Sequence, residues 1–243
     1  MSAYGPLAAC YDAFTRDVPY DALAAYYLSL LRRPGKERMT LLDLCCGTGA
    51  LTLRLAGDGH ELIGVDLSPE MLSRARAKAE EAALDTPPLF LCQAAPELDL
   101  YGTVEGAFCC LDGFNYLPPE DLPETLRRLH LFIEPGGVLA FDFHAPEHLR
   151  ELDGCCFADE TDDALCIWRG EFDDGEGALF YAIDILTRAG ALWRREQEEH
   201  VEYAHSPEAL RGALERAGFS DITLLRDGPQ HEQGRLFFRA VNR

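Results

Sequence analysis

The chain of 243 residues is 47% hydrophobic and 26% charged, an ordinary balance for a globular domain, and it is long enough to bury one full core. Its net charge of −20 argues against a nucleic-acid-binding surface, because such a surface needs clustered Lys and Arg. An apolar run of 18 residues and a basic start followed by an apolar stretch are both missing, so we expect a cytoplasmic protein without a membrane span or secretory signal.

The nine cysteines are expected to be reduced thiols, because no export signal accompanies them. They occur partly as adjacent pairs within apolar runs, where cysteine behaves as a small buried hydrophobe. No C-x-x-C spacing supports a zinc site. A metal site made of Asp142, His144 and His148 is not expected either, because these residues straddle a strand end and Pro146. We therefore expect no metal.

The first 36 residues are predicted to be helical. Tyr4 and Tyr11 belong to a short helical pattern, and Asp17 caps a helix that has a proline in its first turn and ends near Leu31. Segment 1–36 is interpreted as a helical lid over a ligand site, with Tyr4 and Tyr11 facing the ligand. The alternative is an N-terminal helix that only packs on the core.

Residues 41–49 (LLDLCCGTG) are the pattern around which the chain is organised. A buried strand leads into two glycines, and a helical pattern follows. Gly47 and Gly49 allow a sharp turn and a close approach by a ligand, to which the helix start offers free N–H groups. This is typical of a nucleotide or nucleoside site. The dinucleotide fingerprint requires a third glycine where Thr52 stands, so a pyrophosphate is not required.

Strands and helices then alternate. A second buried strand ends at Asp66, which suits a ribose-bearing ligand because an acid at this position binds ribose hydroxyls. Ser68 caps a helix to about Ala82. Further strands and one helix are predicted at 87–92, 104–111, 118–133 (the helix) and 137–143. This alternation predicts a doubly wound α/β fold with a parallel sheet.

Segment 151–203 departs from this alternation. It holds 15 acidic and 4 basic residues, and its strand-like runs are joined by Asp/Gly turns. We expect a small antiparallel β insertion over the active site, whose charge could attract a cationic or amine substrate. The alternative is a solvated acidic face. A helix from Ser206 to Gly218 and two strands, at 221–226 and 235–241, complete the chain as a terminal hairpin.

Several motifs resemble those of class I S-adenosylmethionine-dependent methyltransferases. Residues 41–49 look like the first motif of that family, residues 62–68 (LIGVDLS) like the second, and residues 134–139 (EPGGVL) like the turn before the fifth strand. Stretches 4–20, 111–117 and 141–144 are similar to a group of small bacterial methyltransferases. The resemblance implies one domain, 1–243, with a Rossmann-like seven-stranded sheet and S-adenosylmethionine as cofactor.

The resemblance also implies roles for individual residues. Asp43 would lie near the ammonium of the cofactor, Asp66 would accept the ribose hydroxyls, and Leu67 would lie against the adenine. The implied cofactor contacts are Tyr11, Asp43, Cys45, Gly47, Thr48, Gly49, Asp66, Leu67, Met71, Gln93, Ala94, Leu111 and Asp112. Relatives usually carry an acid for the adenine amine where Ala94 stands here. Its loss costs about 1 kcal/mol, roughly fivefold in affinity, unless Gln93 or backbone groups replace it.

Methyl transfer from a sulfonium depends mainly on in-line placement of the acceptor, and a base matters only when the acceptor must lose a proton. Asp142 and His144 lie two apart on a predicted strand, at the end where parallel sheets bind ligands. We expect one of them to orient or deprotonate the acceptor, the alternative being a His144 bonded to local backbone. Asn115 and Tyr116 are the expected substrate contacts.

The sequence is therefore interpreted as a methyltransferase that acts on N or O of a small molecule, without nucleic acid or membrane as partner and with a homodimer possible. Two alternatives remain. A nicotinamide-dependent oxidoreductase is disfavoured by Thr52, and a protein that binds S-adenosylmethionine without catalysis differs only in lacking turnover.

Overall fold

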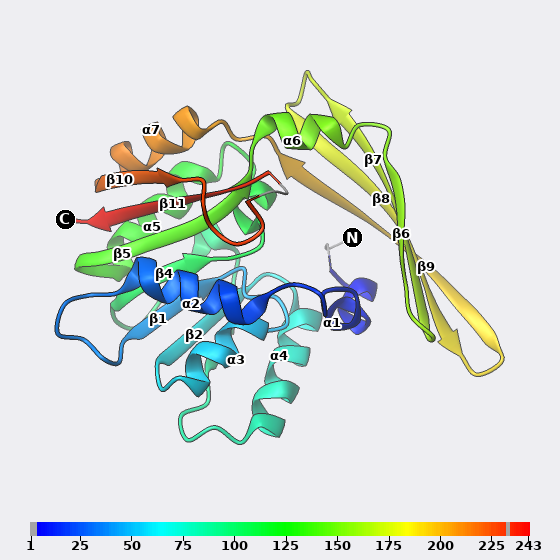
Figure 1. Ribbon diagram of the computed structural model, residues 1–243, viewed down its shortest axis with the longest axis horizontal. Helices are drawn as coiled ribbons and strands as arrows, with labels where there is room; N and C mark the ends of the chain where they lie inside the picture. The colour runs from blue at the N-terminus through cyan, green and yellow to red at the C-terminus, as the bar shows by residue number, and fades with distance from the viewer. Residues whose placement is uncertain (1–3, 232–233) are drawn as a thin grey trace.

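The computed structural model describes residues 4–231 and 234–243, which form two β-sheets (Figure 1). The strands of the larger sheet are β1 (Thr40–Leu44), β2 (Glu61–Asp66), β3 (Leu89–Cys92), β4 (Val104–Cys109), β5 (Ile133–His144), β10 (Phe219–Leu225) and β11 (Arg235–Asn242). Their order is β3-β2-β1-β4-β5-β11-β10; β1 to β5 are parallel, and β11 is antiparallel to both neighbours. The predicted seven-stranded sheet with a C-terminal hairpin is confirmed.

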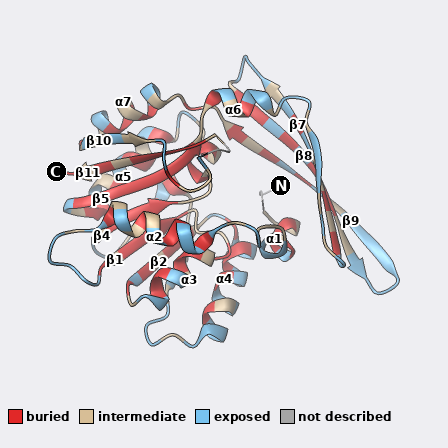
Figure 2. Ribbon diagram, in the orientation of Figure 1, coloured by how far each residue is buried: buried red, intermediate tan, exposed pale blue. Residues whose placement is uncertain are grey.

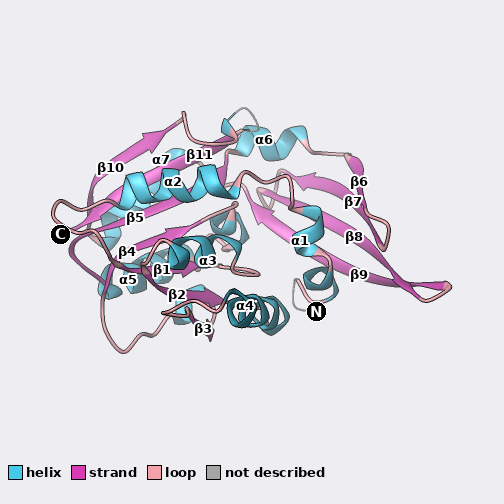
Figure 3. Cartoon of the chain, turned by 60° about the horizontal axis from the view of Figure 1, so that its bottom comes forward, coloured by secondary structure: helices cyan, strands magenta, loops and turns pink. Residues whose placement is uncertain are grey.

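Helices cover both faces of this sheet (Figures 1 and 3). One face carries α2 (Tyr20–Leu31), α3 (Ala50–Gly57) and α4 (Pro69–Ala82), and the other carries α5 (Leu122–Phe132) and α7 (Pro207–Ala217). Side chains of β1 alternate between the two: Leu41 packs with α2 and α3, whereas Leu42 and Leu44 pack with α5 and α7. The buried stripe that results runs through the centre of the molecule (Figure 2).

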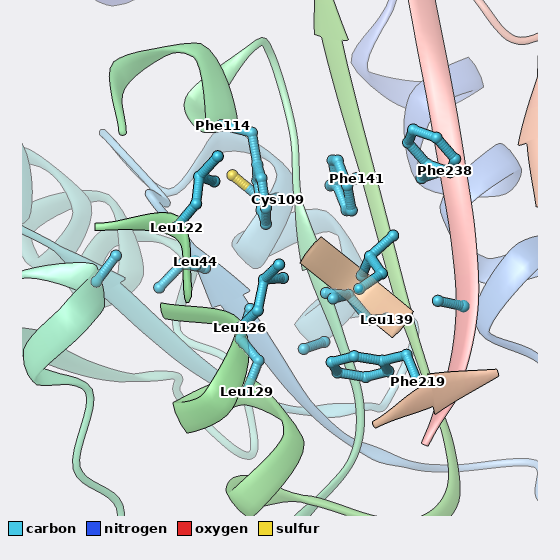
Figure 4. Packing of buried hydrophobic residues seen from close by; sticks show 14 of the residues in the cluster. Leu44, Cys109, Phe114, Leu122, Leu126, Leu129, Leu139, Phe141, Phe219 and Phe238 are labelled. Atoms are coloured by element: carbon cyan, nitrogen blue, oxygen red, sulfur yellow. The ribbon is translucent and has the colours of Figure 1, made fainter. Parts of the chain in front are cut away.

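Several phenylalanine rings pack together in the core beneath α5 and α7. Phe114 and Phe141 stack with ring centroids 3.8 Å apart, and Phe141 continues to Phe238 at 5.6 Å. Figure 4 shows these rings in the same cluster as Leu126 of α5. Burial of this apolar surface fixes the strand ends from which the site is built.

The turn between β1 and α3 follows the local sequence closely. Gly49 has φ +73°, and a Cβ there would lie 3.1 Å from that of Ala75 and 3.2 Å from the Phe90 ring. Only glycine fits both the conformation and the packing. Ser68 caps α4 as predicted, since its Oγ accepts from Met71 N.

The second sheet is antiparallel and four-stranded, in the order β6-β7-β8-β9, and projects beyond the carboxyl ends of β1, β4 and β5 (Figure 1). Its strands are β6 (Cys156–Glu160), β7 (Ala164–Asp173), β8 (Ala178–Ala189) and β9 (Leu192–Tyr203). The insertion of antiparallel strands is confirmed, but β6 was not predicted. Its five residues are largely exposed and show no alternation. The short α6 (Pro146–Glu151) leads into it and was also missed, because six residues show too little periodicity.

Two further boundaries differ from prediction. The helix expected at 118–133 begins at Leu122, and β5 begins directly at Ile133 rather than at Gly137. The turn-like Pro135-Gly136 lies within the strand as an irregular pairing with β4. Among the described residues, no helix is long and apolar enough to cross a membrane, and no group of three or more His, Cys, Asp or Glu side chains is arranged to hold a metal ion.

Candidate active site

A cavity of about 250 Å³ lies at the carboxyl ends of β1, β2 and β4. The glycine turn, the loops after β2 and β4 and the N-terminal segment supply its wall: Tyr4, Tyr11, Tyr20, Asp43, Cys45, Cys46, Gly47, Thr48, Ala50, Leu51, Asp66, Leu67, Ser68, Met71, Cys110, Leu111, Gly113 and Tyr116. Open parallel sheets bind ligands at this edge, where the strand order reverses between β1 and β4.

Asp66 connects the two loops that flank the cavity. Its Oδ2 accepts from Gly47 N at 2.8 Å, and its Oδ1 accepts from Ser68 N at 2.8 Å. Burial raises the pKa of Asp66, and the N–H groups of Ser68 and Gly47 oppose that rise. The remaining lone pairs of this carboxylate can accept from a ligand diol. Gly47, at φ +54°, leaves open space where a side chain would stand.

Asp43 is a buried acid at the floor of the cavity, and its side-chain Oδ2 accepts from the Thr52 hydroxyl at 2.5 Å. Burial raises the pKa of Asp43 to about 7; the Thr52 hydrogen bond opposes this and the nearby Asp66 adds to it. A carboxyl with so high a pKa is poised to pair with a cationic group that enters the cavity. Thr52, which excluded the dinucleotide fingerprint, thus orients the acid.

Tyr4 and Tyr116 form another part of the cavity wall, called here the tyrosine end. The Tyr4 hydroxyl donates to Tyr116 Oη at 2.7 Å, and Tyr116 Oη lies 3.2 Å from His200 Nδ1. Ser68 Oγ donates to the Tyr4 carbonyl at 3.0 Å. Glu198 of β9 accepts from the backbone N–H of Tyr4, at 3.0 Å, and of Leu7, at 2.7 Å. The N-terminal segment is therefore held between the α4 start and the insertion.

Behind the loop that follows β4 lies a buried ion pair. Asp142 of β5 accepts from Leu111 N at 2.9 Å, Asp112 N at 2.6 Å and Tyr27 Oη at 2.7 Å, and from Arg235 Nη1. Leu111 and Asp112 have φ of +59° and +55°, a left-handed conformation that costs about 1–2 kcal/mol per residue. Asp142 offsets this strain and so fixes the cavity wall at Leu111.

Comparison with known proteins supports one family. The family described as "Methyltransferase domain" matches residues 41–137. YqeM of Bacillus subtilis, whose name gives it as a methyltransferase and assigns no substrate, is 31% identical and aligns over 98% of this chain and 96% of its own. An S-adenosylmethionine-dependent methyltransferase structure from Clostridium acetobutylicum superposes with a TM-score of 0.82, at 26% identity and over 99% of both chains.

The chain is a class I S-adenosylmethionine-dependent methyltransferase. CalS10 of Micromonospora echinaspora, an amino pentose methyltransferase solved with S-adenosylmethionine bound, shares the fold with a TM-score of 0.72, at 20% identity, over 100% of this chain and 99% of its own. The earlier interpretation of family, fold and cofactor is thus confirmed.

The cavity suits the chemistry of that cofactor. S-adenosylmethionine carries an ammonium, a ribose diol and a flat aromatic base, and the methyltransferase offers the buried acid Asp43, the carboxylate Asp66 and, for the face of the base, the side chains of Leu67 and Met71. The open space at Gly47 accommodates the close approach of the ligand backbone. We propose that these residues hold it.

The cavity brings together most of the residues predicted for the cofactor. Those in its wall are Tyr11, Asp43, Cys45, Gly47, Thr48, Asp66, Leu67, Met71 and Leu111, with the predicted substrate residue Tyr116. Thr48 contributes chiefly through its backbone, because its hydroxyl donates to Asp12 and contacts Lys78. Gly49 lies just behind the wall, where it shapes the start of α3.

Other predicted residues lie outside the wall. The side-chain amide of Gln93 is bonded to the backbone N and O of Asp99, so it closes its own loop outside the cavity wall. Ala94 also lies outside. Asn115 is fully buried, and its side chain bonds the backbone of His144 and the Tyr203 carbonyl, so it joins β5 to the insertion and lies outside the cavity wall.

The expectation that Asp142 orients or deprotonates the acceptor does not fit its position. The side chain is fully buried, and four donors occupy its oxygens. His144 lies outside the cavity wall too. Its Nε2 lies 3.3 Å from Arg235 Nη2 and 3.5 Å from Asp112 Oδ1. Asp112 accepts from Arg235 Nη2 at 2.9 Å. These groups form a network behind the site.

Several wall residues were not predicted from the sequence. Cys46, Ala50, Leu51, Ser68, Cys110 and Gly113 are neighbours of motif residues and could have been included on that ground. Tyr20 offered no local signal, because it reaches the cavity only through the placement of α2. Glu198 and His200 lie outside the wall but contact its residues Tyr4 and Tyr116, and they could not be distinguished among the many acidic and polar residues of the insertion.

Proposed function

We propose that this methyltransferase transfers a methyl group to an amine nitrogen of a small molecule bound between the cavity and the insertion. The observation that carries the proposal is the composition of the tyrosine end: Tyr4 and Tyr116 meet a buried face of β9 made of Glu198, His200 and Glu202. An ionisable acid beside the acceptor position favours an amine, whose ammonium form can pair with that acid or lose a proton to it, over a neutral alcohol. CalS10, which acts on an amino pentose, supports the same acceptor class.

S-adenosylmethionine supplies an electrophilic methyl group when bound. The chain's own residues then have to place the acceptor nitrogen in line with that methyl and exclude water. Leu111 and Tyr116 form the wall at which the acceptor would lie, and Asp142 keeps that wall in place. We further propose that residues 1–36 act as a lid and that insertion 151–203 covers the acceptor, since Glu198 joins the two.

A tritiated-methyl assay tests this function. The panel pairs primary amines with hydroxyl counterparts, for example glucosamine with glucose and ethanolamine with ethylene glycol. We expect label in amines and none in the hydroxyl partners. Label only in hydroxyl compounds, or in no compound, would contradict the proposal.

A further inference from the structure

One face of β9 points towards the tyrosine end of the cavity. Glu198, His200 and Glu202 are two residues apart and so share a face of the strand. Glu198 binds the N-terminal segment, and His200 contacts Tyr116. The end of β9 is held by Asn115, whose side chain bonds both the Tyr203 carbonyl and the His144 backbone. Glu202, 7% exposed, lies on this same face next to His200, and the Tyr116 hydroxyl is near enough to act on the pKa of its carboxyl group.

Two carboxyl groups at this end have opposite proton affinities. Burial raises the pKa of Asp112, but the Arg235 guanidinium and His144 outweigh burial and hold it below its usual range. Burial raises the pKa of Glu202 well above its usual range, and the negative charge of Asp112 raises it further. Arg235 and the Tyr116 hydroxyl oppose that rise without cancelling it. When the pKa values of two neighbouring acids differ in this way, one acid stays ionised and the other can take up and release a proton.

We propose that Glu202 is the final acceptor of the proton that the substrate ammonium must lose, and that the Tyr116 hydroxyl passes the proton to it. The inference rests on the proposed amine methylation. An N–H bond of the ammonium breaks, the proton moves to Tyr116 Oη, and the Tyr116 proton moves to a Glu202 carboxylate oxygen. The freed nitrogen lone pair forms the N–C bond while the S–CH₃ bond breaks and its electron pair stays on sulfur.

The surroundings of Glu202 favour this direction of transfer. Burial disfavours an ammonium–carboxylate pair and favours the neutral amine with a neutral carboxyl. Asp112 stays ionised and so makes a poor base at neutral pH. The groups that face Glu202 are Asp112, Tyr116 and Arg235, with Tyr4 from the N-terminal segment and Tyr181 from β8. The two tyrosines beyond Tyr116 have raised pKa values and stay neutral.

The pH dependence follows from proton counting. Methyl transfer requires a neutral amine. When Glu202 is protonated and the substrate is an ammonium, one of these two protons must be lost to solvent before transfer can occur. Activity therefore rises with pH as Glu202 ionises. Without Glu202 the substrate must ionise alone, so the rise moves up towards the pKa of the amine itself, about 10 for an alkylamine.

Glu202→Gln and Tyr116→Phe test the inference, with Glu199→Gln as the matched control because Glu199 is exposed on the other face of β9. The substrate is an alkylamine that wild type methylates, such as ethanolamine, because the expected shift is worked out for the pKa of an alkylamine. We expect both test variants to lower kcat at least about a hundredfold at pH 7 and to recover at high pH, with unchanged affinity for S-adenosylmethionine. Glu199→Gln should behave as wild type. A wild-type pH profile in Glu202→Gln would overturn the inference, whereas no methylation of amines by wild type would overturn the proposed function instead.

Infrared difference spectra provide a measurement that needs no turnover. At pH 7 wild type should show a protonated carboxyl band that Glu202→Gln lacks and Glu199→Gln keeps. Absence of that difference would also overturn the inference. Glu202→Asp retains a carboxyl group and should recover part of the low-pH activity, which a purely structural role would not predict.

Discussion

Asp142→Asn distinguishes a structural role of this residue from a catalytic one. The substitution keeps the shape of the side chain but removes the charge that pairs with Arg235, and its NH₂ group cannot accept from the donors that now bind there. Breaking a buried ion pair costs about 3–5 kcal/mol. Arg235 keeps Asp112 as a partner, so we expect the lower end, about 3 kcal/mol.

For a chain of this length 1 kcal/mol shifts Tm by about 2–4 °C, so Asp142→Asn should lower Tm by about 6–12 °C. The assay is thermal unfolding followed by circular dichroism, with Asp85→Asn as control because Asp85 lies in an exposed loop. The control should stay within about 0.5 kcal/mol of wild type. Methylation by Asp142→Asn should fall together with affinity for S-adenosylmethionine, since the wall at Leu111 loosens.

The reasoning would be refuted by an Asp142→Asn protein with wild-type Tm and wild-type cofactor affinity but no turnover. That outcome would show Asp142 acting on the acceptor, as the sequence alone suggested. Retention of all three properties would show that neither role matters.

Three further predictions concern the cofactor. Asp66→Ala should weaken S-adenosylmethionine binding by at least about tenfold in calorimetry, because a charged acceptor contributes about 1.5–3 kcal/mol per hydrogen bond; unchanged affinity would remove Asp66 from the site. Burial raises the pKa of Asp43 to about 7, so between about pH 4 and about pH 7 the folded protein holds a proton that the unfolded chain has lost. Stability of the ligand-free protein should therefore decline as pH rises through this range, and affinity for the cationic cofactor should increase; a flat affinity in Asp43-intact protein would speak against the ammonium assignment. Deletion of residues 1–15 should lower cofactor affinity, and equal affinity would rule out the lid.

The first half of the fold was predictable because its signals are local. The glycines of residues 41–49, Asp66 at a strand end and the Ser68 cap each specify a conformation within a few residues of themselves. The order of strands followed from their alternation with helices. These short-range features also define the part of the cavity assigned to the cofactor, which explains why that prediction largely matches the wall.

The rest of the site depends on contacts between distant segments, and no local pattern encodes them. Asp142 was expected to face a substrate because it sits at a strand end, yet its partners Tyr27 and Arg235 lie 115 and 93 residues away. Tyr4 meets Glu198 over 194 residues. The local sequence pattern around a carboxylate at a strand end is therefore the same whether the carboxylate faces a cavity or a buried guanidinium.

The composition of the acidic insertion was equally incomplete as a guide to the site. Its 15 acidic residues predicted a negative electrostatic potential, but they did not indicate which of these residues face the site. Only the alternation of β9, combined with the pairing of Asn115 to Tyr203, separates the buried Glu198 and Glu202 from the exposed Glu199. Because the two buried acids meet Tyr4 and Tyr116 while the exposed ones meet solvent, the chemistry of the insertion depends on side-chain direction and not on net charge.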